Sequence, residues 1–208
     1  MRPPTGLLAA AALGLAAITA TTAQAPTTVG TPSIKNLQQA FVDENATRAR
    51  YLAFARRADE DGYHSVAGLF RAMSVAEEVH AASMAAALKK NGAQAKPLAV
   101  EPEVAATEAN LALAAKTEEK ERDAVYPALL EAAKGEGNNE AVRAFKVALA
   151  AEGEHAKLCR AALGDLAKWK EGDKQFVVCL SCGFTTADTA VAKCPTCGLD
   201  RERMYLAD

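Results

Sequence analysis

The chain has 208 residues, of which 50% are hydrophobic and only 5% aromatic, a composition that suits closely packed helices better than a β-sandwich. Its 24 basic and 26 acidic residues give a formal net charge of −2 without a long run of like charge, so nothing indicates a nucleic-acid partner. The length allows one medium-sized domain, or a domain with a small additional module.

Residues 1–25 have the pattern of a secretory signal peptide. Arg2 precedes an apolar run from Leu7 to Ile18, and residues 23–25 (Ala-Gln-Ala) form a small-x-small cleavage pattern. The run is about a dozen residues long, whereas a membrane-spanning helix needs roughly 20, so an uncleaved anchor is the weaker alternative. We therefore expect an exported, periplasmic protein that starts near Pro26 and has no membrane association after cleavage.

Four long helices are predicted from the spacing of apolar residues and from the glycines and prolines that interrupt it. Ser33 is the candidate N-cap of the first helix, and Pro127 is expected to kink the third near Asp123. The segment from Gly92 to Ala106 has no helical period, and a long crossover between two helix pairs is the ferritin-like arrangement. The helices are expected at Ile34–Asp61, Ser65–Lys90, Thr107–Lys134 and from just after Asn138 to about Lys168.

Ionisable side chains lie in the middle of the apolar stripe of every predicted helix. In the last helix they are Glu152 and His155, and a buried glutamate without a partner would cost several kcal/mol, so the pattern requires a cation. Glu77 and His80 repeat this spacing, and an inward Glu-x-x-His pair is half of a dinuclear site in four-helix bundles. The complete set is Glu44, Glu77, His80, Glu118, Glu121, Glu152 and His155.

Together these seven residues predict a dinuclear metal centre. Each one alone would be interpreted as a surface glutamate or a hydrogen-bonded core histidine. In one core, however, their like charges would repel each other, and two cations remove that repulsion. Carboxylate-rich ligation with two imidazoles suits iron or manganese. Cys159 lies one turn beyond His155, where we expect a small buried hydrophobe rather than a ligand.

The C-terminal region contains two Cys-x-x-Cys pairs, each followed by a glycine that lets the backbone donate hydrogen bonds to sulfur. Export leaves disulfides open as an alternative. Two adjacent pairs of this kind nevertheless favour one tetrahedral four-sulfur site, for either iron or zinc. The four cysteines are Cys179, Cys182, Cys194 and Cys197.

In combination, these motifs closely resemble the rubrerythrin family. The resemblance covers nearly all of the mature chain, and it implies an all-α ferritin-like four-helix bundle over residues 26–170 and a small C-terminal rubredoxin-like metal-binding domain over residues 174–208. The motifs that carry it are residues 44–51 (ENATRARY), Glu77-x-x-His80, Glu118-x-x-Glu121 followed by Val125-Tyr126-Pro127, Glu152-x-x-His155 and the four cysteines.

The resemblance also implies how two irons would be held. Glu77 and Glu152 would bridge them, Glu44 and Glu118 would be terminal ligands, and His155 would hold one of them.

Four residues would act in catalysis. Glu121 and His80 would alternate on the second iron as its oxidation state changes, and Tyr51 and Tyr126 would hydrogen-bond the carboxylates. A single redox-active iron would be bound by Cys179, Cys182, Cys194 and Cys197.

The implied function is a non-haem diiron peroxidase that reduces hydrogen peroxide to water in oxidative stress protection. Electrons would arrive through the four-cysteine iron from an unidentified redox protein, and a homodimer or higher homo-oligomer is implied because the two sites of this family meet across a dimer. Two alternatives are a ferroxidase or iron-handling protein, and a redox sensor whose small domain holds zinc. Phe176 stands where a tryptophan commonly precedes the first cysteine, so we expect the small domain to pack differently.

Overall fold

The structure is a computed structural model that describes residue 1, residues 30–170 and residues 174–207. Apart from residue 1, the expected signal peptide lies outside the described residues. In the two described segments, no helix is both long and apolar enough to cross a membrane. The helices are α1 (Pro32–Glu60), α2 (His64–Lys90), α3 (Thr107–Lys120), the π-helix η1 (Glu121–Val125), α4 (Tyr126–Gly135), α5 (Asn139–Gly164) and α6 (Leu166–Lys170).

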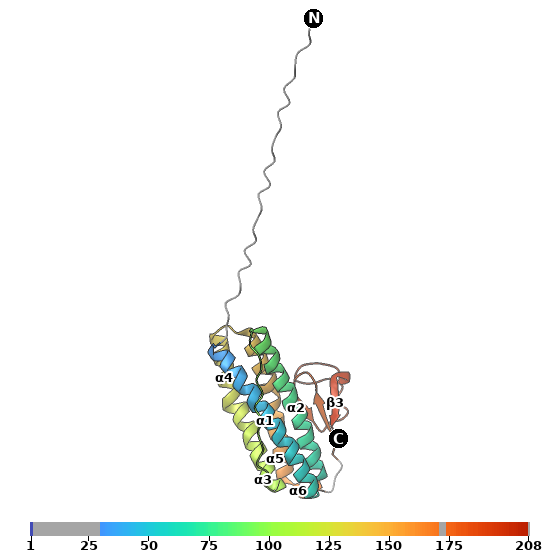
Figure 1. Cartoon of the computed structure of the whole chain (residues 1–208). Helices are drawn as coiled ribbons and strands as arrows, with labels where there is room; N and C mark the ends of the chain where they lie inside the picture. Colours follow the sequence, from blue (N-terminus) through green and yellow to red (C-terminus); the bar gives the residue numbers. More distant parts are fainter. Residues whose placement is uncertain (2–29, 171–173, 208) are drawn as a thin grey trace.

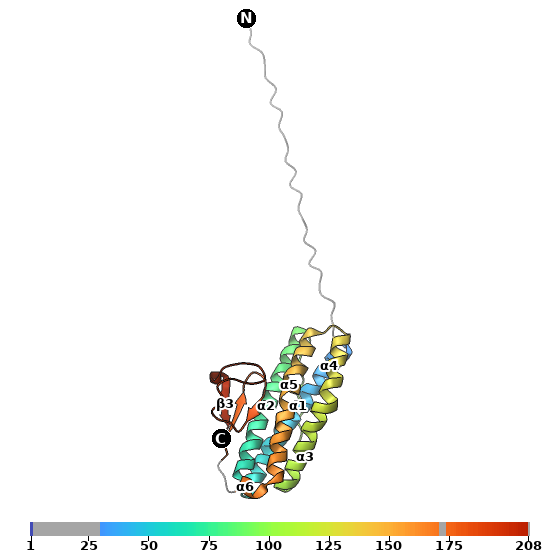
Figure 2. The same cartoon turned by 180° about the vertical axis from the view of Figure 1, so that it is seen from behind.

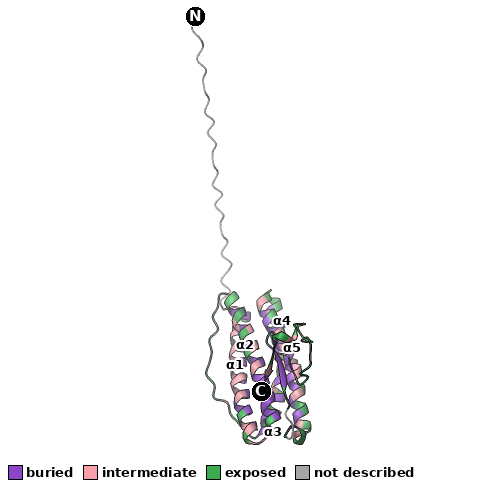
Figure 3. Ribbon diagram, turned by 90° about the vertical axis from the view of Figure 1, so that its right-hand side faces the viewer, coloured by how far each residue is buried: buried purple, intermediate pink, exposed green. Residues whose placement is uncertain are grey.

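Two helix pairs form a bundle (Figure 1). α1 packs mainly against α2, and α3 and α4 pack against α5. α2 and α3 run in the same direction, so the non-helical residues 93–106 connect opposite ends of the bundle along its outside, as expected for a crossover (Figure 3). Most of this connection is exposed.

The apolar core of the helical bundle is divided into two clusters, and a third cluster lies in the C-terminal region. Of the two bundle clusters, one includes Tyr51, Phe54 and Phe70, and the other includes Tyr126 and Phe145. Full burial of each such aromatic side chain stabilises the fold by roughly 2–3 kcal/mol. Each cluster contributes one tyrosine hydroxyl to the polar region between the two clusters, where the ionisable residues lie.

The first two helices begin earlier than predicted. Ser33 is not the N-cap of α1: the helix starts at Pro32 with Thr31 as its N-cap. Proline is well suited to this position because it has no N–H to leave unpaired. The Ser33 N–H instead donates to the carboxylate of Glu136, at 3.0 and 3.2 Å. α2 begins at His64, one residue before the predicted start at Ser65, and the His64 side chain is exposed.

The third and fourth helices are each interrupted. The kink predicted near Asp123 takes the form of the π-helix η1, in which the Tyr126 N–H donates to the Glu121 carbonyl, five residues earlier. Pro127 follows at the start of α4, where its missing N–H disturbs the helix least. The fourth helix does not continue to Lys168, because α5 ends at Gly164 and the short α6 follows.

The four cysteines belong to a small module with a three-stranded antiparallel sheet. Its strands are β1 (Phe176–Cys179), β2 (Thr185–Thr186) and β3 (Met204–Ala207), in the order β2-β1-β3, with the 3-10 helix η2 (Arg201–Arg203) before β3. The module packs on α2 and α5 of its own chain (Figure 2).

Phe176 joins this module to the core of the bundle. Its ring is fully buried and stacks on Trp169 of α6, with 5.9 Å between the ring centroids. The ring packs beside Gly68 of α2, where a Cβ would make an ordinary van der Waals contact with it at 3.7 Å. The phenylalanine therefore attaches β1 to the bundle.

Candidate dinuclear metal centre and four-cysteine site

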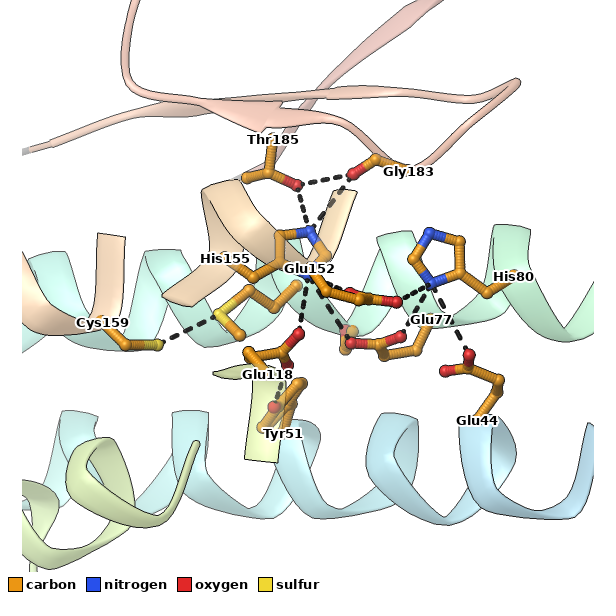
Figure 4. Close-up of polar contacts among 12 residues, drawn as sticks. Glu44, Tyr51, Glu77, His80, Glu118, Glu152, His155, Cys159, Gly183 and Thr185 are labelled. Atoms are coloured by element: carbon orange, nitrogen blue, oxygen red, sulfur yellow. Dashed lines mark hydrogen bonds and ion pairs between the residues drawn. The ribbon is translucent and has the colours of Figure 1, made fainter. Parts of the chain in front are cut away.

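Six of the seven predicted metal ligands meet in the centre of the bundle (Figure 4). On α2 and on α5, the three-residue spacing of Glu and His places both side chains on the same helix face. α1 and the last turn of α3 each add one glutamate. The six side chains are at most 2% exposed: Glu44, Glu77, His80, Glu118, Glu152 and His155.

The six residues form two groups that share two glutamates. One group is Glu44, Glu77, His80 and Glu152, and the other is Glu77, Glu118, Glu152 and His155; within each group the ligand atoms lie within 4.8 Å of one another. The rings of the two histidines are 6.1 Å apart. Two cation positions with shared carboxylates are the arrangement of a dinuclear centre.

The shared glutamates have the orientation of bridging ligands. Nδ1 of His80 lies 3.0 Å from Oε2 of Glu77 and 3.3 Å from Oε1 of Glu152. Nδ1 of His155 lies 3.1 Å from Oε2 of Glu152 and 3.9 Å from Oε1 of Glu77. Each glutamate thus turns one oxygen toward each histidine, and a cation beside each histidine would contact both glutamates.

The outer nitrogen of each histidine faces the four-cysteine module. Nε2 of His80 lies 3.3 Å from the carbonyl oxygen of Cys182, and Nε2 of His155 lies 3.3 Å from that of Gly183 and 3.1 Å from Oγ1 of Thr185. A carbonyl can only accept, so the hydrogen of a neutral imidazole resides on Nε2. Nδ1 then directs a lone pair at the carboxylates.

Metal ions suit this arrangement of donors. Lone pairs of Nδ1 and carboxylate oxygens at these distances repel each other unless a cation lies between them. Among the described residues, Oε1 of Glu77 and Oε1 of Glu152 are buried without a hydrogen-bond partner. Burial raises the pKa of Glu44, Glu77 and Glu152 well above the usual range, while it lowers the pKa of His80.

Tyrosine hydroxyls hold the two outer glutamates. Tyr51 donates to Glu118, and Tyr126 donates to Glu44, in both cases through short hydrogen bonds between buried groups. Burial raises the pKa of Glu118, but the neighbouring His155 and the hydrogen bond from Tyr51 outweigh burial, and the net pKa is lowered. The two tyrosines therefore contact the two outer carboxylates.

Glu121 lies beside the two ligand groups without belonging to either. It is the first residue of the π-helix, and its Oε2 is buried without a hydrogen-bond partner among the described residues. Burial, followed by the negative charges of Glu118 and Glu44, raises its pKa to about 9. In this structure His80, rather than Glu121, completes the group that contains Glu44.

The four cysteines converge on one point. Their Sγ atoms lie within 4.8 Å of one another, with 3.6 Å between Cys179 and Cys197 and 3.5 Å between Cys182 and Cys194. A disulfide would require about 2.05 Å, whereas a tetrahedron with bonds of about 2.3 Å has sulfurs about 3.8 Å apart. The cysteines are thus free thiols with the spacing of a four-sulfur metal site.

Thr185 was not predicted from the sequence, and Gly183 was predicted for a different role. Gly183 has φ of +77°, and a Cβ on it would lie 2.3 Å from Nε2 of His80. The glycine therefore permits both the turn and the contact with the histidine. No sequence signal distinguishes Thr185 from Thr186. Cys159 lies in the core with its Sγ 3.6 Å from Sδ of Met73, outside both ligand groups.

Known proteins share this architecture. Nigerythrin from Nitratidesulfovibrio vulgaris is 34% identical over 84% of this chain and 86% of its own length. Rubrerythrin-2 from Clostridium acetobutylicum is 31% identical over 82% of this chain and 97% of its own. A structure of partially reduced nigerythrin matches with a TM-score of 0.77 and 31% identity, covering 88% of this chain and 90% of that one.

The helical fold extends to more distant proteins. A bacterioferritin from Desulfovibrio desulfuricans matches with a TM-score of 0.61 at 18% identity, covering 67% of this chain and 82% of that one, which shows the ferritin-like fold alone. The predicted fold class is confirmed by the nigerythrin match and the cysteine cluster. The family model "Rubrerythrin" matches residues 35–163, and this chain belongs to the rubrerythrin family.

Proposed function

We propose that this protein is a diiron peroxidase that reduces hydrogen peroxide to water with electrons delivered through its four-cysteine site. The observation that carries the proposal is the contact between the two sites. Both histidines of the dinuclear centre hydrogen-bond the turn that contains Cys182. An electron-carrying site placed there serves a reaction that consumes electrons.

Bound iron would supply Lewis acidity and the two electrons that the reduction of one peroxide requires. Glu44, Glu77, Glu118, Glu152 and the two histidines would hold the dinuclear iron, and the four cysteines would hold one further iron. The chain provides an apolar surround: residues of both core clusters exclude bulk water from the carboxylates, which strengthens electrostatic interactions within the site.

Glu121 is assigned to proton transfer, and the two tyrosines to holding the carboxylates. In the metal-free protein the pKa of Glu121 is about 9, so its carboxyl holds a proton at neutral pH. Reduction of peroxide to two waters consumes two protons, and a protonated carboxyl beside the site is suited to donate one. Burial raises the pKa of Tyr51 and Tyr126, so both hydroxyls stay protonated and keep donating to Glu118 and Glu44.

The approach to the site suits a small substrate. A cavity of about 100 Å³ between α1 and the π-helix is lined by residues that include Asp43, Glu121 and Tyr126. A water molecule occupies roughly 30 Å³ in the liquid, so the cavity has room for a molecule the size of peroxide. Glu121 and Tyr126 both line this cavity.

We further propose that the protein acts outside the cytoplasm in protection against oxidative stress, as a homo-oligomer that receives electrons from a soluble redox protein. The alternative of a ferroxidase is less well supported, because iron oxidation requires no electron supply and would not need the module on the dinuclear site. A redox sensor with zinc in the module would also lack an electron path.

The test compares two oxidants with the same reduced protein. Fully reduced protein, loaded with about three irons per chain, is mixed anaerobically with hydrogen peroxide and, separately, with oxygen in a stopped-flow spectrometer. We expect peroxide to oxidise the dinuclear centre faster. Faster oxidation by oxygen would contradict the peroxidase assignment, and two irons with one zinc in the native protein would remove the electron path.

A further inference from the structure

The outer nitrogens of both metal-site histidines find their partners on the module. Nε2 of His80 and Nε2 of His155 meet residues 182–185, and no acceptor from the described helices is recorded for either atom. The dinuclear site therefore lacks part of its surroundings without the module. Groups that bind the second nitrogen of a metal-ligating histidine fix its tautomer and ring orientation.

Thr185 makes the shortest of these contacts. Its side chain is fully buried, and Oγ1 lies 3.1 Å from Nε2 of His155. The single hydroxyl hydrogen is used by Gly183, since Oγ1 donates to that carbonyl at 3.0 Å. Oγ1 consequently offers His155 lone pairs, so Nε2 must be the donor and Nδ1 must face Glu118 and Glu152 without a hydrogen.

We infer that Thr185 is a positioning residue for the dinuclear centre: it holds His155 in the Nε2–H tautomer with Nδ1 directed at the metal. The inference rests on the metal-binding part of the proposed function and not on peroxide reduction. The four-cysteine module thereby has a second role, because its residues hydrogen-bond the histidines of the dinuclear site and hold them in position.

The module is attached to this site within one chain. Residues 171–173 separate α6 from the module, and both sides of this segment are anchored on the same bundle. Trp169 stacks on Phe176 at 5.9 Å, and the Lys174 N–H donates to Oγ of Ser65 at 3.1 Å. β2, which carries Thr185, pairs with β1, which begins at Phe176. Thr185 is thereby placed over α5 by its own chain's contacts.

The test uses Thr185→Val in the full-length chain loaded with zinc at both sites. Valine has the same shape and suits a strand, so it removes the hydroxyl with little change in packing. Thr186→Val is the matched control, because the neighbouring hydroxyl instead accepts from the Asp188 N–H in an exposed turn. Thr185→Ser, which restores a hydroxyl, tests rescue.

Two measurements follow. In ¹⁵N-histidine NMR spectra we expect the His155 Nε2–H to be protected from exchange in the wild type and in Thr185→Ser, and to exchange at least about tenfold faster in Thr185→Val, since a hydrogen-bond partner is lost. Zinc affinity of the dinuclear site should fall roughly 10- to 100-fold in Thr185→Val. Thr186→Val should match the wild type in both measurements.

Three results would overturn the inference. The first is a wild-type His155 with its hydrogen on Nδ1, which can be read even if a variant fails to fold. The second is unchanged affinity and exchange in Thr185→Val, and the third is an equal loss in Thr186→Val. Zinc-loaded protein performs no redox chemistry, so these outcomes are independent of whether the iron form is a peroxidase.

Discussion

Replacing Gly183 by alanine should separate the module from the dinuclear site without altering any ligand. Gly183 has φ of +77°, and its Cβ would lie 2.3 Å from Nε2 of His80 and 3.0 and 3.1 Å from two ring carbons. Gly198 is a matched control in the second Cys-x-x-Cys-Gly turn. Its φ is +76°, but a Cβ there would meet no atom within 4 Å.

The two substitutions share one cost and differ in another. Alanine in the left-handed region costs about 1–2 kcal/mol at either position. At Gly183 the methyl group must also displace the module from His80, which breaks at least the contacts of the two histidines, at about 1 kcal/mol each. Gly183→Ala should therefore lower the free energy of unfolding by about 2 kcal/mol more than Gly198→Ala.

Urea unfolding of the zinc-loaded full-length chain measures this difference. Trp169, the single tryptophan, stacks on Phe176 where the module meets the bundle, so its fluorescence reports whether the module is in place. We expect Gly183→Ala to change the fluorescence before the bundle unfolds. Equal destabilisation by the two variants, with identical fluorescence, would refute the proposed contact.

Two further predictions concern the carboxylates. In the metal-free protein the pKa of Glu121 is raised from 4.5 to about 9, mainly by burial. Between these two pH values the folded chain therefore binds more protons than the unfolded chain. The stability that this group contributes is complete below about pH 4.5 and is lost as the pH rises through 9. Glu121→Gln should flatten the fall in thermal stability between pH 5 and 9 measured by calorimetry, and an unchanged slope would contradict this. Tyr126→Phe should weaken metal binding at the group containing Glu44 by roughly 10- to 100-fold in isothermal titration, because the Glu44 carboxylate loses its hydroxyl partner. Tyr63→Phe, outside the site, is the control, and equal weakening by this variant would contradict a specific role for Tyr126.

The helices and the ligand set could be predicted because both are local or periodic. Helical periodicity places the Glu-x-x-His pairs of α2 and α5, and the acids of α1 and α3, on the buried faces of their helices. This placement does not depend on the conformation of the loops. The crossover was predictable from its prolines and missing period. The ends of α1 and α5 were not, since they depend on groups far away in the chain, such as Glu136 at the start of α1.

The contact between the two sites could not be predicted, because it depends on three-dimensional packing. Gly183 was identified only as part of a Cys-x-x-Cys-Gly turn. Its approach to His80 depends on a turn whose Cys182 lies 102 positions after the histidine. Thr185 lies in a two-residue strand with Thr186, and the two side chains point to opposite faces of the strand. Which hydroxyl contacts His155 depends on which face lies against the bundle. The π-helix could not be predicted either. Pro127 predicts a kink in the third helix, but a kink can take several forms, and the proline alone does not decide which one occurs.

The most direct test of the proposed electron path is the reoxidation of the four-cysteine iron by peroxide. Fully reduced full-length protein is mixed anaerobically with at least two equivalents of hydrogen peroxide per chain, enough to oxidise all three irons, and the absorbance of the oxidised four-sulfur iron is followed at several protein concentrations. Delivery through a contact that already exists in the assembled protein predicts a first-order signal whose rate constant does not change on dilution. A four-sulfur iron that stays reduced after the peroxide is consumed, or a rate proportional to protein concentration, would contradict it.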